Sequence, residues 1–183
     1  MSSQGQASED LQFDPDALRD KYQLERDKRL RDDGNQQYQE MSGEFDHYTD
    51  DPYVENLIER EPVKDSVEIV IVGGGFGGLI SGARFRELGY ESIRIIEKGG
   101  DFGGTWYWNR YPGAACDTEA YIYLPLLEEV GYVPTQKYAH APEILQHSRN
   151  IAEKFDLYRD VCFQTEVTGM QWDERDQQWI IRT

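Results

Sequence analysis

The fold is decided by residues 67–89, VEIVIVGGGFGGLISGARFRELG. The β-branched run at 67–72 predicts a buried parallel strand. A glycine-rich turn follows at once, and residues 79–89 predict a helix that ends at Gly89. Residues 92–97, SIRIIE, predict a second strand. Together these segments predict a strand–helix–strand unit with a right-handed crossover.

The turn between the first strand and the helix has the spacing G-x-G-x-x-G at Gly73, Gly75 and Gly78. In a chain with 17 glycines this spacing alone is weak evidence, but here it lies between a strand and a helix. Gly73 permits a tight turn, Gly75 lets a pyrophosphate approach the backbone, and Gly78 lets the helix pack on the strand. The pattern predicts a dinucleotide site at the helix N-terminus. The alternative is a glycine-rich turn that binds no ligand.

Glu97 indicates which dinucleotide to expect. It lies 19 positions after Gly78, at the end of the second strand. There its carboxylate can accept both hydroxyls of an adenosine ribose, and its charge disfavours the 2′-phosphate of NADP. A second glycine-rich stretch at 98–104 and an aromatic cluster at 105–109 follow. This long loop favours a flavin dinucleotide over NAD, although such a cluster is also compatible with core packing.

Composition excludes several classes of protein. The chain has 19 Lys and Arg against 35 Asp and Glu, and this net charge of −16 argues against a nucleic-acid or anionic-membrane partner. No apolar run is long enough for a membrane helix, and the polar N-terminus does not resemble a secretory signal. Two cysteines, and histidines without ligand spacing, predict neither a disulfide framework nor a metal site. We therefore expect a cytoplasmic protein.

The charge also divides the chain. Residues 1–66 carry 8 basic and 18 acidic side chains, a net charge of −10, against −6 for the remaining 117 residues. We therefore expect an acidic N-terminal arm at 1–66 and an FAD-binding domain at 67–183. In the arm, disorder is expected up to about Phe13, a helix lying on a larger surface at 16–30, and an extended, turn-rich wrap at 33–66. On composition, the arm is a solvated extension without chemistry.

The C-terminal third completes the predicted domain. Residues 142–155 predict an amphipathic helix with a proline near its start. Strands are predicted at 161–165, 167–172 and 178–182, with a hairpin turn at 173–176 between the last two. The fold class is therefore α/β: a Rossmann-like domain with a parallel sheet and small antiparallel strands. Because residues 179–183 look like a strand without a cap or tail, we expect the domain to be truncated.

Residues 103–117, GGTWYWNRYPGAACD, closely resemble the type I Baeyer–Villiger monooxygenases. The members of this family are flavoproteins that use FAD, NADPH and O2 to convert ketones to esters or lactones. The resemblance extends from about Val67 to the C-terminus, and the arm resembles the N-terminal extension of larger members. It implies that the chain is the FAD-binding, N-terminal part of such an enzyme. The N- and S-oxygenating flavin monooxygenases do not usually carry the Asn-Arg-Tyr-Pro-Gly…Asp continuation, which disfavours them.

The resemblance also implies roles for matching residues. The FAD pyrophosphate and adenosine ribose would be held by Gly73, Gly75, Phe76, Gly78 and Glu97. The flavin would be lined by Thr105, Trp106, Tyr107 and Trp108. Asp117 would support catalysis beside the flavin and nicotinamide, Ala115 and Cys116 would border the nicotinamide path, Tyr123 would reach the FAD phosphates, and Val167 would meet the adenine. From the residues alone, a helix N-cap remains open for Asp117 and packing for Tyr123.

Other parts that the family needs are missing from these 183 residues. They contain no second G-x-G-x-x-G for NADPH, no Phe-x-Gly-x-x-x-His-x-x-x-Trp fingerprint and no active-site arginine of the family. We therefore expect the chain to bind FAD but to be inactive alone. The NADPH domain would lie in the remainder of the enzyme or in a complementing chain, and the ketone and O2 would be partners of the complete enzyme. A non-catalytic module that binds adenine dinucleotide remains the alternative from another class.

Overall fold

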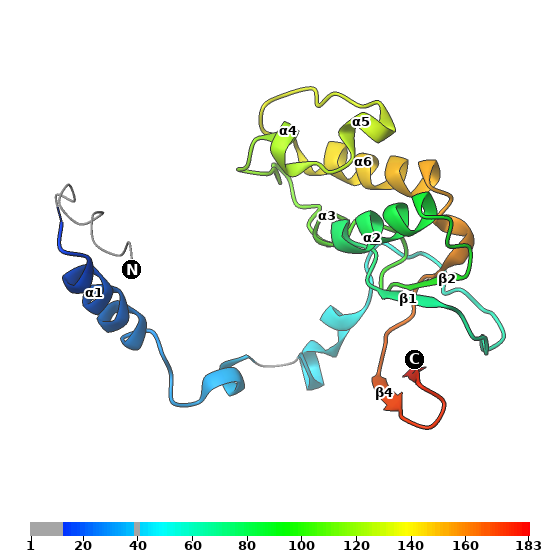
Figure 1. Cartoon of the computed structure of the whole chain (residues 1–183), viewed down its shortest axis with the longest axis horizontal. Coiled ribbons are helices and arrows are strands. Elements are labelled where there is room, and N and C mark those ends of the chain that lie inside the picture. The colour runs from blue at the N-terminus through cyan, green and yellow to red at the C-terminus, as the bar shows by residue number, and fades with distance from the viewer. Residues whose placement is uncertain (1–12, 39–40) are drawn as a thin grey trace, which may run out of the picture. The chain divides into compact units, whose positions relative to one another are not determined.

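The computed structural model describes residues 13–38 and 41–183. The chain forms two compact units, Met1–Asp50 and Asp51–Thr183 (Figure 1). The expected disorder of the first residues lies outside the described residues, apart from Phe13. In the described ranges, no helix is both long and apolar enough to cross a membrane.

The first unit contains α1 (Pro15–Asp27) and two 3₁₀ helices, η1 (Gly34–Gln37) and η2 (Gly43–Thr49). The predicted first helix is confirmed but ends three residues early. Asp14 caps it, because its Oδ1 accepts the backbone N–H of Asp16 at 2.9 Å and of Ala17 at 3.3 Å. No residue of α1 is buried, so its expected packing on a larger surface stays a prediction.

A parallel three-stranded sheet forms the centre of the second unit. Its strands are β1 (Ile69–Val72), β2 (Ile93–Ile96) and β3 (Val161–Cys162), in the order β1-β2-β3. Ile69 is paired with Ile93, and Ile95 with Val161. The third strand is shorter than predicted, because Gln164 adopts a left-handed conformation (φ 51°) that turns the chain out of the sheet.

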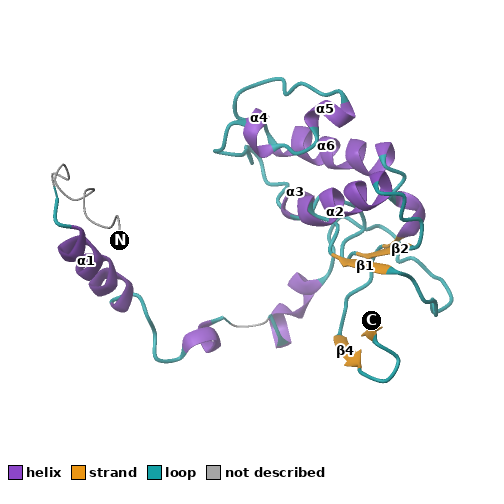
Figure 2. Ribbon diagram, viewed as in Figure 1, coloured by secondary structure: helices purple, strands orange, loops and turns teal. Residues whose placement is uncertain are grey.

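Two long helices lie side by side next to this sheet (Figures 1 and 2). α2 (Phe76–Glu87) contacts β1 and β2, and α6 (Ala141–Lys154) packs against α2. α2 begins three residues earlier than predicted, since Gly75 is its N-cap. One of two apolar clusters lies between these layers and contains Ile71, Leu79, Ile93, Ile95, Phe102, Ile151, Ala152 and Leu157.

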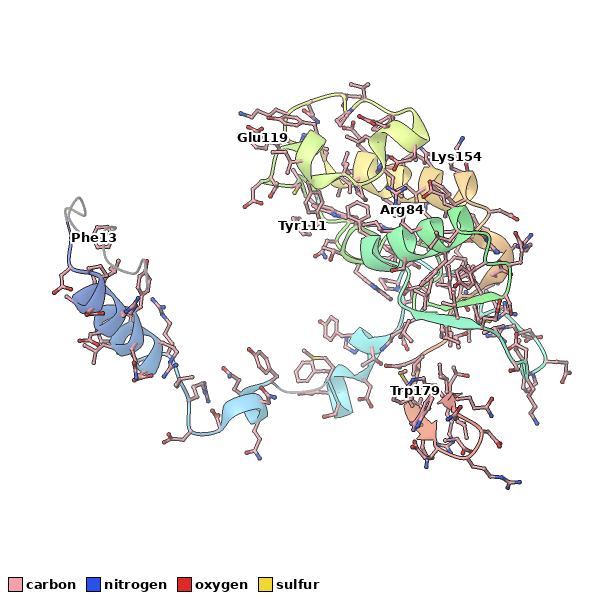
Figure 3. The ribbon with its side chains drawn as sticks, in the orientation of Figure 1. Phe13, Arg84, Tyr111, Glu119, Lys154 and Trp179 are labelled. Atoms are coloured by element: carbon pink, nitrogen blue, oxygen red, sulfur yellow. The ribbon has the colours of Figure 1, made fainter. Side chains whose placement is uncertain are left out.

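Three short helices lie between β2 and α6: α3 (Thr105–Trp108), α4 (Ala120–Tyr123) and α5 (Leu127–Val130). A 3₁₀ helix, η3 (Tyr158–Asp160), follows α6 and leads into β3. Arg84 on α2 points toward α5 (Figure 3), where its guanidinium pairs with Glu129 at 2.5 Å. The chain continues into β4 (Gly169–Asp173) and β5 (Gln178–Arg182), which form the predicted antiparallel hairpin. The predicted α/β class, with a parallel sheet and a small antiparallel pair, is confirmed.

The second compact unit begins at Asp51, not at Val67. Residues 51–66, which the charge pattern assigns to the arm, therefore lie with the α/β domain. The division of function at residue 67 stays a prediction.

Candidate functional site

The glycine turn, residues 73–78, joins β1 to α2. Gly73 has φ +99°, a conformation that L side chains rarely adopt, and its N–H donates to Ile96 O at 2.8 Å. A Cβ at position 78 would lie 2.0 Å from Gly73 O. The turn itself therefore requires glycine at both positions, independently of any ligand.

Gly75 leaves the start of α2 open. It is the N-cap residue and has no side chain to accept the first N–H groups of the helix. These groups and the helix dipole form the kind of site that binds phosphates. A Cβ on Gly75 would lie 3.4 Å from Gly104 Cα. The direct neighbour of this position is thus the second glycine stretch, which is also tied to the turn by a 2.9 Å hydrogen bond from Gly103 N to Gly74 O.

Glu97 lies between the two glycine stretches. Its Oε2 accepts the N–H of Gly74, and its Oε1 accepts the N–H of Gly99 at 2.6 Å. The residue is 6% exposed, and the groups that hold it are backbone donors, not a basic side chain. A carboxylate offers about four lone-pair positions, so two remain for further donors. Two is the number of donors that the predicted contact with a ribose requires, and that contact stays a prediction.

Three predicted site residues from three helices meet beside the turn. Trp106 donates from Nε1 to the Tyr123 hydroxyl at 3.0 Å, and their rings are edge-on with centroids 6.0 Å apart. The ring of Phe76, the first residue of α2, is 5.6 Å from that of Tyr123. Trp106 is buried in an apolar cluster against which Phe76 and Tyr123 pack. These contacts link the start of α2 to α3 and α4.

Tyr107 makes a separate set of contacts. Its hydroxyl donates to Asp51 Oδ2 at 2.6 Å and accepts the N–H of Gly100 at 2.9 Å. Burial, together with the hydrogen bond to Asp51, raises the pKa of Tyr107 to about 12. Trp108 is edge-on to Tyr107, with centroids 4.9 Å apart, and Thr105 is exposed. Trp106 and Tyr107 thus make separate sets of hydrogen bonds, and the predicted lining of a flavin by Thr105, Trp106, Tyr107 and Trp108 stays a prediction.

The remaining predicted residues lie further along the chain. Cys116 is buried and donates its N–H to Ala139 O at 3.0 Å, while Ala115 is exposed and forms a β-bridge with His140. Asp117 is exposed and Val167 is half-buried. Neither is hydrogen-bonded to the glycine turn within the part of the chain that the structure describes. Their roles stay predictions.

A cavity of about 460 Å³ opens beside Trp106. This volume lies within the range of small-molecule sites, and the wall is mainly apolar. The lining residues are Trp106, Arg110, Tyr111, Pro112, Gly113, Ala114, His140, Ala141, Pro142 and Leu145. Tyr111 projects from the loop after α3 (Figure 3). The glycine turn and Glu97 are not in this wall, so the cavity is distinct from the candidate phosphate site.

Sequence reasoning missed Asp51 and Tyr53. Asp51 bonds Tyr107, and Tyr53 donates its hydroxyl to Trp108 O at 3.2 Å. The one available signal was the Asp51-Pro52 pair, which reads equally well as an ordinary turn.

Comparisons with known proteins also indicate a dinucleotide-binding domain. A family model described as an NAD(P)-binding Rossmann-like domain matches residues 71–131. The chain is 52% identical over 166 residues to a Baeyer–Villiger monooxygenase of Streptomyces coelicolor. The aligned region covers 91% of this chain and 28% of that protein.

Two solved structures are informative. The polycyclic ketone monooxygenase from the thermophilic fungus Thermothelomyces thermophila matches with a TM-score of 0.76 and 39% identity, over 91% of this chain and 28% of that one. OTEMO in complex with FAD and NADP matches with a TM-score of 0.60 and 32% identity, over 64% of this chain and 22% of that one. The resemblance to the Baeyer–Villiger monooxygenases is therefore confirmed. The chain spans somewhat more than a quarter of the length of the curated relatives it matches.

Proposed function

We propose that this chain, a homologue of the Baeyer–Villiger monooxygenases, binds FAD and forms the FAD-binding part of an enzyme that converts ketones to esters or lactones with NADPH and O2. The observation that carries the proposal is the arrangement around Glu97. Its carboxylate joins Gly74 to Gly99 beside the uncapped start of α2. Acceptors for a ribose and donors for a pyrophosphate thus lie within one turn of the backbone.

The charge of Glu97 favours FAD over NADP at this turn. A 2′-phosphate on the ribose would bring negative charge against a buried carboxylate, and the structure pairs that carboxylate with backbone amides instead of a cation. FAD has a free adenosine ribose and meets no such repulsion. We therefore assign NADPH to the remainder of the complete enzyme.

The chain's residues would bind and shield the cofactor. The open N–H groups at the start of α2 would hold the pyrophosphate, and Glu97 the ribose. Phe76, Trp106 and Tyr123 would form an apolar wall that limits access of water. Asp117, exposed after the Pro112-Gly113 turn, is the proposed supporting carboxylate beside the flavin and nicotinamide. FAD, when bound, supplies the redox chemistry that side chains lack.

Titration of the purified chain with FAD and with NADP⁺ tests this proposal. We expect FAD to bind and NADP⁺ to bind at least about tenfold more weakly, since the 2′-phosphate meets Glu97. Glu97→Gln removes one of two ribose acceptors and should weaken FAD binding about tenfold. Glu153→Gln, an exposed carboxylate on α6, is the matched control and should change nothing. Equal affinity for the two nucleotides, or no flavin binding, would contradict the proposal.

An activity assay tests whether this chain needs the remainder of the enzyme, to which we assign NADPH, for the complete reaction. We expect no ester from the isolated chain with NADPH and a ketone, because its 183 residues contain a single G-x-G-x-x-G between a strand and a helix. Ester formation by the isolated chain would show that the whole reaction needs no further domain.

A further inference from the structure

Residues 51–65, which we call the strap, lie against the second glycine stretch and against the segment that follows β3. Asp51 makes the first attachment. Its Oδ2 accepts the N–H of Gly100 at 3.1 Å and the hydroxyl of Tyr107 at 2.6 Å. Its Oδ1 accepts the N–H of Tyr53 at 2.9 Å, so this carboxylate is oriented by the strap itself.

Gly100 fits closely under the strap. A Cβ at this position would lie 2.5 Å from Val54 Cγ2 and 2.8 Å from the Tyr107 hydroxyl. Such distances are too short for real contacts, and both neighbours are stiff side chains. Glycine at position 100 is therefore required by the strap and Tyr107.

The second attachment is to residues 164 and 165. Gln164 Oε1 accepts the N–H of Ile58 at 2.8 Å, and Arg60 Nη2 donates to Thr165 Oγ1 at 2.7 Å. Near the end of the strap, Asp65 pairs with Arg94 on β2 at 2.6 Å. The strap is thus bonded along most of its length.

Both attachments adjoin Glu97. Gly99, next to Gly100, donates its N–H to Glu97 Oε1, and Thr165 donates its N–H to Glu97 O at 3.0 Å. Gln164 joins the two segments, because its N–H donates to Gly99 O at 3.0 Å. The strap therefore bonds to the neighbours that orient Glu97, and not to Glu97 itself.

We propose that the strap is a positioning element of the dinucleotide site, with Asp51 as its key residue. By fixing Gly100 and Tyr107, Asp51 keeps the Gly99 N–H on Glu97 and so keeps the carboxylate in place for the ribose. This inference rests on the proposed function, because it assumes that Glu97 binds the ribose of FAD. It also gives part of the arm a role that its composition does not suggest.

The test compares variants of the full 183-residue chain by their affinity for FAD and for ADP. Asp51→Ala should weaken binding of both ligands about tenfold, because a loosened Gly99 no longer holds Glu97. ADP contains the ribose and pyrophosphate but no flavin. A loss of affinity for ADP therefore places the effect at the ribose and pyrophosphate site, which includes Glu97. Asp51→Asn keeps an acceptor and should weaken binding only about threefold. Glu59→Gln, an exposed strap carboxylate, should bind like the unsubstituted chain.

A double-mutant cycle separates positioning from general destabilisation. If Asp51 acts through Glu97, the double variant Asp51→Ala/Glu97→Gln should bind FAD no more weakly than Glu97→Gln alone. Amide hydrogen exchange should be faster at Gly74, Gly99 and Gly100 in the Asp51 variants, in the absence of ligand. If Asp51→Ala does not fold, Asp51→Asn serves for both measurements.

The outcomes for the two proposals differ. If the unsubstituted chain does not bind FAD, the proposed function is wrong. If it binds FAD and the Asp51 variants bind equally well, or if the losses in the double variant add, the strap does not position Glu97.

Discussion

The two glycine-rich stretches of this chain are alike in composition, but glycine is required in them for different structural reasons. In residues 73–78, Gly73 and Gly78 are required by the backbone of their own strand–turn–helix unit. In residues 99–104, Gly99 and Gly100 lie against side chains: a Cβ on Gly99 would be 2.9 Å from Tyr107 Cε1, and one on Gly100 would meet Val54 and Tyr107. The constraint on Gly73 and Gly78 is thus local backbone, whereas Gly99 and Gly100 are constrained by side chains outside their own stretch, one of which, Val54, is far away in the sequence.

The difference shows what a glycine pattern can reveal. Where neighbouring backbone requires the glycines, they recur at a fixed spacing, and that spacing predicts the geometry of the turn. Where side chains from other segments require them, the glycines have no characteristic spacing. Substitutions in the two stretches should therefore respond differently to second-site changes.

The largest effect is expected for Gly78→Ala. Its Cβ would overlap Gly73 O, and neither backbone can move without opening the contact between β1 and α2. We expect a loss of about 3 kcal/mol or more in the free energy of unfolding, measured by urea denaturation. Since the obstacle is backbone, no single side-chain truncation should restore stability. A Gly78→Ala chain as stable as the unsubstituted one would show that the turn is not held as described.

Gly100→Ala should have a smaller effect that can be rescued. We expect a loss of about 2 kcal/mol, because Val54 and the Tyr107 hydroxyl must both be displaced. Val54→Ala removes the nearer atom, so the double variant Val54→Ala/Gly100→Ala should lose less than the sum of the single losses. Additive losses would mean that the strap does not limit this position.

Alkaline pH should weaken the strap contact. The raised pKa of Tyr107 means that the folded state favours the protonated phenol. The stabilisation that the protonated phenol contributes is therefore fully present below pH 10 and is lost as the pH rises from 10 toward about 12. In Tyr107→Phe, the free energy of unfolding should fall less steeply over this interval, by about 1 kcal/mol in total. Urea denaturation at several pH values measures the slope. Identical slopes would contradict the bond from Tyr107 to Asp51.

Gly77→Ala should have the smallest effect and is the control for Gly78→Ala. Among the described residues, no atom outside the adjacent residues and the backbone of α2 lies within 4 Å of a Cβ at this position. Alanine is the better helix former, so we expect stability to be unchanged or raised by up to about 1 kcal/mol. A loss comparable with that of Gly78→Ala would remove the distinction between the two positions.

Local patterns predicted the elements of the fold well. The β-branched run, the glycine turn and the position of Glu97 belong to one strand–helix–strand unit, and the structure brings Glu97 back onto Gly74. The early end of β3 could not be seen in the sequence, because Gln164 leaves the sheet and its side chain bonds the strap.

The candidate site was predicted less completely. Trp106 and Tyr107 are adjacent in an aromatic run, which gives no sign that Trp106 joins Tyr123 while Tyr107 bonds Asp51. Asp51 looked like part of an acidic, turn-rich arm, since its partners Gly100 and Tyr107 are about fifty residues away in the sequence. The distribution of charge along a sequence indicates which segments are exposed to solvent, but it does not show which distant residues an individual carboxylate will bond.

The contact between Gly75 and Gly104 has an evolutionary consequence. A Cβ on Gly104 would lie 2.7 Å from Gly75 Cα, in a backbone conformation (φ +53°) that already favours glycine. Gly104 therefore cannot acquire a side chain without displacing Gly75, whereas a Cβ on Gly75 would lie 3.4 Å from Gly104 Cα, an ordinary contact distance. Descendants of this sequence that replace Gly104 should carry compensating changes in residues 73–78, and replacements of Gly75 need no such partner.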